Sequence, residues 1–208
     1  MPPADTRLHP IPDHATDGGR DPMTPQGICT CWPGATVWLT GLPSAGKTTL
    51  AHELAGRLRA EGRRVEVLDG DEIRTFLSAG LGFSRADRDT NVQRIGLVAE
   101  VLARNGVTVL VPVIAPYADS REAVRKRHEG SRTPYLEVHV ATPVEVCSER
   151  DVKGLYAKQA AGQIAGLTGV DDPYEAPEKP DLRIETHHRT VQESAAALHA
   201  LLTERGLA

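Results

Sequence analysis

The residues best suited to chemistry form the loop Gly41-Leu42-Pro43-Ser44-Ala45-Gly46-Lys47-Thr48, followed by Thr49, which matches the Walker A pattern Gly-x4-Gly-Lys-Thr. Its glycines allow successive backbone N–H groups to converge on phosphate oxygens, and a following helix adds the positive end of its dipole. We expect Lys47 to bridge the β- and γ-phosphates and the Thr48 hydroxyl to bind Mg²⁺. The loop therefore predicts a nucleoside triphosphate site rather than a Gly-rich turn that binds nothing.

Two carboxylates follow in Asp69-Gly70-Asp71-x2-Arg74. One suits an Mg²⁺-bound water and the other can accept a proton from an attacking hydroxyl, and the two roles can be exchanged between Asp69 and Asp71. Arg74, one helical turn further on, can pair with an anionic group of an acceptor molecule. The alternative is an Asp-capped helix start without a catalytic role.

A third group consists of Phe83, Arg88 and Asn91. Phe83 is one of only two phenylalanines and can stack on a base, although it can equally anchor a small satellite core. Arg88 and Asn91 are three residues apart and so share a helical face. The nearest competing P-loop class is excluded, because the guanine-reading Asn-Lys-x-Asp element of GTPases is absent from the sequence.

Short apolar runs alternate with amphipathic ones and must position these side chains. We expect strands over residues 35–40, 64–68, 107–114, 135–140 and 182–185, and helices over residues 48–60, 92–102, 119–129, 143–150 and 190–202. This order predicts an α/β fold with a parallel sheet, helices on both faces and ligands at the carboxyl ends of the strands. Residues 151–180 are rich in Gly, Lys, Asp and Pro, and we expect them to form a lid.

The chain of 208 residues carries a formal net charge of −4, which argues against nucleic-acid or anionic-membrane partners. No apolar run approaches the roughly 18–20 residues of a membrane span, and no secretory signal is recognisable, so a cytoplasmic protein is expected. Residues 1–30 are rich in Pro and Gly and are expected to be a flexible extension of a domain over 31–208, unless Met23 is the natural start.

The three cysteines, Cys29, Cys31 and Cys147, do not predict a disulfide scaffold. Cys29 and Cys31 are interpreted as incidental thiols rather than a redox pair or half of a metal site. No second Cys pair and no His pair at ligand spacing supplies the other half.

These motifs occur in an order that resembles adenylylsulfate kinases (APS kinases). The resemblance rests on the motifs above and on four further segments: Gly82-Phe83-Ser84-x3-Arg88-x2-Asn91, Ile114-Ala115-Pro116-Tyr117, Arg150-Asp151-Val152-Lys153-Gly154-Leu155-Tyr156 and Gly166-Leu167-Thr168-Gly169. It covers about residues 35–190, and no sulfurylase-like domain accompanies it, as in stand-alone members. It implies a three-layer P-loop nucleoside-triphosphate hydrolase-like fold.

The resemblance implies transfer of the ATP γ-phosphoryl group to the 3′-hydroxyl of adenosine 5′-phosphosulfate (APS), giving PAPS and ADP, in sulfate assimilation. It implies ATP and Mg²⁺ as cofactors and a homodimer as the expected assembly. Lys47, Asp69 and Asp71 would be catalytic, with Asp71 orienting or deprotonating the hydroxyl and Asp69 nearer the metal with Thr48. The acceptor would be contacted by Asp71, Arg74, Phe83, Arg88, Asn91, Ile114, Ala115, Lys153, Leu155, Gly166 and Leu167, while Arg150, Lys153 and Lys158 would close over the phosphates.

Two positions depart from the family pattern. Ala115 stands where members often have Ser, so a phosphoenzyme route through that residue is impossible and direct in-line transfer is expected. Leu167 stands where Phe is usual, and losing one face of an adenine sandwich costs about 1–3 kcal/mol, so weaker APS binding or a slightly altered acceptor is expected.

Two other functions stay open at this level. One is a P-loop kinase for another small hydroxylated anion, such as a sugar acid or nucleoside. The other is a catalytically silent nucleotide-binding module, against which the intact Lys47, Thr48, Asp69 and Asp71 argue.

Overall fold

The computed structural model describes residues 33–208, so the extension predicted over 1–30, Met23, Cys29 and Cys31 lie outside the described residues. The strands are β1 (Ala35–Thr40), β2 (Val65–Val67), β3 (Thr108–Pro112), β4 (Tyr135–Val140) and β5 (Leu182–Ile184). The helices are α1 (Lys47–Ala60), α2 (Gly70–Thr75), α3 (Arg85–Ala103), α4 (Ala118–Gly130), α5 (Val144–Arg150), α6 (Leu155–Ala160) and α7 (Val191–Glu204).

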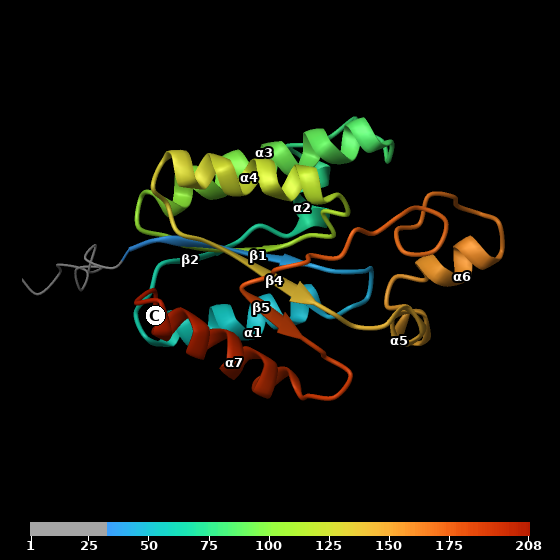
Figure 1. Ribbon diagram of the computed structural model, residues 1–208. Coiled ribbons are helices and arrows are strands. Elements are labelled where there is room, and N and C mark those ends of the chain that lie inside the picture. Colours follow the sequence, from blue (N-terminus) through green and yellow to red (C-terminus); the bar gives the residue numbers. More distant parts are fainter. Residues whose placement is uncertain (1–32) are drawn as a thin grey trace, which may run out of the picture.

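All five strands are parallel and lie in the order β2-β3-β1-β4-β5. Helices α3 and α4 cover one face, and α1 and α7 cover the other (Figure 1). The predicted three-layer P-loop fold with helices on both faces is therefore confirmed. Helices α5 and α6 lie beyond the tips of the strands, at the edge where ligands of such sheets bind (Figure 1).

The sheet separates two apolar cores. Leu50, Leu54 and Leu58 of α1 pack with Leu198 and Leu202 of α7 on one side. Trp38 of β1 packs on the other side with apolar residues of α3 and α4, including Val92, Ile95 and Val124. Every residue of β1, β3 and β4 is buried, as expected for strands of a parallel sheet that is covered on both faces; β1 and β3 are mainly apolar, whereas β4 also buries Glu137 and His139.

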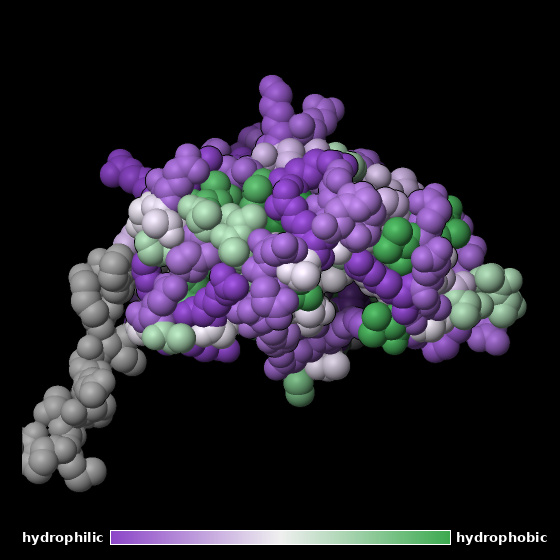
Figure 2. Space-filling view, turned by 90° about the horizontal axis from the view of Figure 1, so that it is seen from below, coloured by the Kyte–Doolittle hydropathy of each residue, from purple (hydrophilic) through white to green (hydrophobic). Residues whose placement is uncertain are grey.

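The surface seen from the side of α1 and α7 is largely hydrophilic, with apolar side chains in small separate groups (Figure 2). Within residues 33–208, no helix combines the length and apolar character needed to cross a bilayer.

The segment 151–180 differs from a loop without regular structure, because it contains the short helix α6. The Asp151 side chain accepts hydrogen bonds from the first backbone N–H groups of this helix, those of Tyr156 at 3.1 Å and Ala157 at 2.9 Å. Sequence reasoning missed α6 because six residues show no helical period that stands out from a Gly-rich background.

Candidate active site

The phosphate loop runs from the end of β1 into α1. Positive φ angles at Ser44 (60°) and Gly46 (99°) curl the backbone between the strand and the helix. Behind the loop, the Ala45 carbonyl accepts hydrogen bonds from the hydroxyls of Thr142 (2.9 Å) and Thr186 (3.0 Å). The loop is thus held by the ends of neighbouring strands.

Lys47 is buried within this loop. Its Nζ donates to the carbonyls of Gly41 at 3.0 Å and Leu42 at 2.7 Å, both within the phosphate loop. Burial lowers the pKa of Lys47 to about 8, because desolvation disfavours the charged amine. The amine is therefore held in place by the two carbonyls, and a bound anion would stabilise its charged form.

The two predicted carboxylates lie beside the loop, at the start of α2. Asp69 Oδ2 accepts a hydrogen bond from the Thr48 hydroxyl at 2.9 Å, while Asp69 Oδ1 caps the helix by accepting from the Asp71 backbone N–H at 2.9 Å. The capping interpretation and the metal interpretation of Asp69 are thus compatible, since each uses a different oxygen. Asp71 itself is exposed and forms an ion pair with Lys153 from the lid.

Arg88 links the Phe83 loop to the lid. Its guanidinium donates to the Phe83 carbonyl (2.8 Å), the Thr168 hydroxyl (2.9 Å) and the Gly166 carbonyl (2.7 Å). It also forms an ion pair with Asp172 at 3.5 Å. Most of the donor capacity of Arg88 is thus committed to holding protein segments together, a positioning role that sequence spacing did not predict.

Phe83 presents its ring to solvent, with 66% of its surface exposed, so it is not the anchor of a satellite core. The guanidinium of Arg74 lies 4.6 Å from the ring centroid, and Arg74 also donates to the Gly82 carbonyl at 3.1 Å. Nearby on α3, Asn91 is buried and its Oδ1 has no hydrogen-bond partner among the described residues. A nucleotide base could stack its face on the exposed Phe83 ring, and a donor on its edge could pair with the Asn91 amide oxygen.

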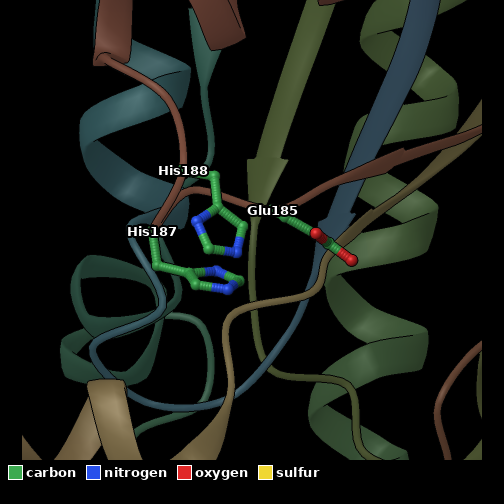
Figure 3. A group of neighbouring side chains, drawn as sticks. All are labelled: Glu185, His187 and His188. Atoms are coloured by element: carbon green, nitrogen blue, oxygen red, sulfur yellow. The ribbon is translucent and has the colours of Figure 1, made fainter.

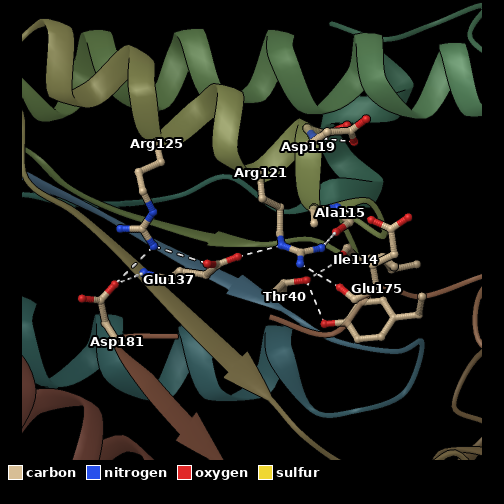
Figure 4. Close-up of polar contacts among 12 residues, drawn as sticks. Thr40, Ile114, Ala115, Asp119, Arg121, Arg125, Glu137, Glu175 and Asp181 are labelled. Carbon is tan, nitrogen blue, oxygen red and sulfur yellow. Dashed lines mark hydrogen bonds and ion pairs between the residues drawn. The ribbon is translucent and has the colours of Figure 1, made fainter. Parts of the chain in front are cut away.

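The loop after β3 carries Ile114 and Ala115. The Ile114 carbonyl accepts from the Thr40 hydroxyl at 2.5 Å, and Ala115 is buried with a φ of 43°. The Ala115 carbonyl accepts from Arg121 Nη1 at 2.7 Å (Figure 4). These two residues therefore offer an ordered backbone wall, with their carbonyls already occupied.

Arg121 was not predicted from the sequence, yet it organises this side of the site. It is buried and donates to Glu137 (2.7 Å), to the Ala115 carbonyl and to the Glu175 carbonyl (2.7 Å) (Figure 4). Glu137 is also paired with Arg125 at 3.3 Å, and Arg125 with Asp181 at 3.5 Å. The downstream end of the lid is thus fixed to the middle of the sheet.

The lid touches the phosphate loop at two points. The Tyr156 hydroxyl donates to the Pro43 carbonyl at 3.1 Å. Gly169, with a φ of 88°, lies so close to Leu42 that a Cβ there would approach the Leu42 side chain to 2.4 Å. A side chain at this position would force the Leu42 side chain to move and would also be strained by the positive φ angle.

The remaining predicted residues divide between the site and the core. Arg150 donates to the Thr186 hydroxyl at 3.0 Å and to the Ala45 carbonyl at 3.5 Å, which places it against the phosphate loop. Leu155 is half-buried, and Leu167 is almost fully buried in the α1 and α7 core, with its backbone N–H bonded to Asp171 at 2.6 Å. Lys158 lies in the last turn of α6.

Known proteins resemble the chain over most of its length. Residues 33–185 match the family model described as adenylylsulphate kinase. The adenylyl-sulfate kinase of Rippkaea orientalis is 53% identical over 173 residues, covering 83% of this chain and 93% of that protein.

Solved structures agree with these matches. A structure of the Mycobacterium tuberculosis APS kinase in complex with AMPPNP and APS superposes with a TM-score of 0.80 at 44% identity, covering 82% of this chain and 98% of that one. A hexameric APS kinase from Thiobacillus denitrificans superposes with a TM-score of 0.66 at 36% identity, covering 86% of this chain and 30% of that one.

Proposed function

The chain belongs to the adenylylsulphate kinase family, and from this premise we propose that it transfers the γ-phosphoryl group of ATP to the 3′-hydroxyl of APS. The products are PAPS and ADP, as sulfate assimilation requires. The observation that carries the proposal is the contact between Lys153 and Asp71. It brings a lid cation and a candidate base together beside the phosphate loop, and these residues are 82 positions apart in sequence.

The donor side is formed by residues 41–49 with Lys47 and Arg150. We assign to Lys47 the task of leaving the carbonyls of Gly41 and Leu42 and binding the β- and γ-phosphates, where its charge stabilises the departing ADP. Arg150, held against Ala45 and Thr186, covers the nucleotide from the lid side.

Thr48 and Asp69 fit a bound Mg²⁺. Their side-chain oxygens lie 2.9 Å apart, and hydroxyl, carboxylate and water oxygens are the ligands that this ion prefers. When bound, Mg²⁺ neutralises charge on the phosphate oxygens. The binding of Mg²⁺ at Thr48 and Asp69 is part of the proposal.

Asp71 is assigned the role of general base. The 3′-oxygen attacks the γ-phosphorus in line, the bond from phosphorus to the β–γ bridging oxygen breaks, and the hydroxyl proton passes to the Asp71 carboxylate. A positioned base contributes about 10²–10⁴-fold to such a step. The ion pair with Lys153 fixes the position of the Asp71 carboxylate, and Ala115 offers no hydroxyl for a covalent intermediate.

The acceptor is assigned to the surface between Phe83, Asn91 and the lid. Phe83 supplies an aromatic face and Asn91 an unpaired amide oxygen for the adenine, while Arg74 and Lys153 supply positive charge for the phosphosulfate. Arg88 acts on the acceptor by holding Phe83 and Gly166 in place. Ile114, Ala115, Leu155 and Gly166 are assigned to the wall around the acceptor, to which Leu167 contributes only its backbone because its side chain is buried.

Two wider expectations belong to the same proposal. We expect a homodimer, although one related kinase is a hexamer. We also expect a cytoplasmic location, in keeping with a reaction that consumes ATP.

An acceptor panel tests the proposal. The protein is incubated with ATP and Mg²⁺ and with APS, 3′-deoxy-APS, a sugar acid or a nucleoside, and ADP release and product phosphorylation are followed. Of these acceptors, we expect only APS to be phosphorylated, and we expect the 3′-deoxy analogue to bind without turnover. Turnover with a sugar acid or nucleoside but not with APS would overturn the assignment, and no turnover with any acceptor would indicate a silent module.

A further inference from the structure

A cluster of nitrogen and oxygen ligands lies outside the catalytic residues, directly after β5. Glu185, His187 and His188 each place one ligand atom so that all three atoms lie within 4.8 Å of one another (Figure 3). His187 and His188 are adjacent in the sequence and so do not match the spaced His pairs of known metal motifs. A turn can nevertheless bring both rings together.

The three side chains are available for a ligand. The rings of His187 and His188 lie 3.7 Å apart at an angle of 43°. His187 Nδ1 is buried and has no hydrogen-bond partner among residues 33–208, so it is not committed to another contact. Glu185 pairs with Arg183, but both side chains are substantially exposed, and exposed ion pairs exchange at little cost.

We propose that Glu185, His187 and His188 bind a late first-row divalent cation, with Zn²⁺ as the best fit. Two imidazoles and one carboxylate form a set of ligands that such cations accept, and a water completes four-coordination. Mg²⁺ is disfavoured, because it prefers oxygen ligands in octahedral geometry. Around a tetrahedral Zn²⁺ the ligand atoms lie roughly 3.3 Å apart. The three atoms here lie within 4.8 Å of one another, so side-chain rotations can bring them to that spacing.

The position of this site joins it to the phosphate loop. Thr186 lies between the proposed ligands, and its hydroxyl donates to the Ala45 carbonyl at 3.0 Å and lies 2.7 Å from the Thr142 hydroxyl. Arg150 contacts both the hydroxyl and the carbonyl of Thr186. A metal that fixes Glu185 and His187 therefore restrains Thr186 and Arg150, so metal affinity and nucleotide affinity are thermodynamically linked. This linkage, unlike the site, rests on the proposed function.

Metal binding is tested without reference to activity. Zn²⁺ is titrated calorimetrically into the full chain and into the His187→Ala/His188→Ala double variant. We expect the wild type to bind one more Zn²⁺ per chain than the double variant, and Glu185→Gln to weaken that site about 10-fold or more. Binding at Cys29 and Cys31 would persist in every variant and would not contribute to the difference. Equal stoichiometry in the wild type and the double variant would overturn the site.

His199→Ala is the matched control, because His199 also pairs with a carboxylate, that of Glu61, at 2.8 Å. It should bind Zn²⁺ as the wild type does. Thermal unfolding keeps the test interpretable: Zn²⁺ should raise the Tm of the wild type and of His199→Ala but not that of the double variant. If the double variant does not fold, an unchanged Zn²⁺ affinity in Glu185→Gln overturns the site.

The linkage has its own readout. The Kd for ATP is measured with and without Zn²⁺ in the wild type and in the double variant, which corrects for Zn²⁺ bound by the nucleotide itself. A Zn²⁺-dependent change confined to the wild type is expected. Identical responses in the two proteins would overturn the linkage but not the metal site. If the wild type binds Zn²⁺ but does not turn over APS, only the proposed function is overturned.

Discussion

The phosphate loop and the lid are built in opposite ways, although they meet at the same site. Each residue of the loop from Gly41 to Lys47 is buried or half-buried, and the loop is held by the contacts of Lys47 with its own carbonyls and by the hydroxyls of Thr142 and Thr186. In the lid over residues 151–180, only Tyr156, Leu167 and Thr168 are buried. The lid is held instead by individual side chains, above all Arg88 and Arg121.

The difference separates two requirements of a kinase. The nucleotide needs a fixed cradle of backbone donors, which the strand–loop–helix junction provides, with its Ala45 carbonyl anchored by the hydroxyls of Thr142 and Thr186. An acceptor must be enclosed and released, and the part of the proposed acceptor site that lies on the lid belongs to a segment with little core of its own. Mutations in the lid clamps should therefore affect the acceptor and spare ATP, and the following experiments test this separation.

The largest effect is expected from Asp71→Asn. An amide cannot take the hydroxyl proton, so we expect turnover to fall by about 10³-fold or more while the Kd for ATP stays within about 2-fold of the wild-type value. ADP release with APS and calorimetric ATP titration measure the two quantities. Substantial remaining activity would show that Asp71 is not the base. Asp69→Asn then tests the alternative, in which Asp69 is the base and Asp71 lies nearer the metal.

The next effect is on stability. Arg121→Met leaves the buried Glu137 without its main partner, so we expect the free energy of unfolding to fall by about 3–5 kcal/mol. Urea unfolding followed by circular dichroism measures it. Lys126→Ala is the control, because its pair with Glu122 is exposed and should contribute less than about 0.5 kcal/mol.

A second variant checks the cause of that loss. Adding Glu137→Gln to Arg121→Met removes the unpaired charge and should restore part of the lost stability. An Arg121→Met protein as stable as Lys126→Ala would show that the lid end is not held by this guanidinium.

Arg88→Lys tests the lid clamp at the acceptor. A lysine cannot reproduce the forked contacts to Phe83, Thr168 and Gly166, so we expect the KM for APS to rise about 10- to 100-fold, or about 1.4–2.8 kcal/mol. The KM for ATP should change less than about 2-fold. Steady-state kinetics with each substrate varied in turn provides the comparison, and equal increases in both KM values would contradict the separation of the two regions.

The smallest effect is a proton linkage within the phosphate loop. Burial lowers the pKa of Lys47 to about 8, so the free protein loses this charge as the pH rises through that value. Bound phosphate favours the charged form, so ATP binding near pH 8.5 should take up a fraction of a proton, and ATP affinity should decrease above pH 8. Calorimetry in buffers of different ionisation enthalpy measures the uptake. Uptake of the same size in Lys47→Arg would assign it to another group.

The parts of the fold that depend on local chemistry could be predicted from the sequence. Strands β1 and β4 match the predicted ranges, because both are short segments rich in β-branched, aromatic and other apolar residues, although β4 also contains Glu137 and His139. The start of α1 at Lys47 is only one residue from the prediction, since the Walker A pattern fixes the strand–loop–helix order. The strand predicted over 107–114 is shorter, Thr108–Pro112, because the chain turns away at Ile114 and Ala115 to form the site wall.

Contacts between distant segments could not be predicted in this way. Arg121 reads as one of several charged residues on an amphipathic helix, and only the folded chain brings it to Glu137 and to the carbonyls of Ala115 and Glu175. The same limit applies to the Lys153–Asp71 pair. Leu167 was assigned to the acceptor by family position alone, and sequence could not reveal that its side chain is buried.

Glu175 has a consequence for how this family can be engineered. Its N–H donates to the Pro116 carbonyl (2.8 Å), its carbonyl accepts from Arg121 and its carboxylate accepts from the Ala118 N–H (2.7 Å). At the other end, Asp151 caps α6. The segment between these two anchors therefore has fixed ends, and any exchange of it between relatives must keep the contacts in its interior, those of Tyr156 with Pro43 and of Gly166 and Thr168 with Arg88.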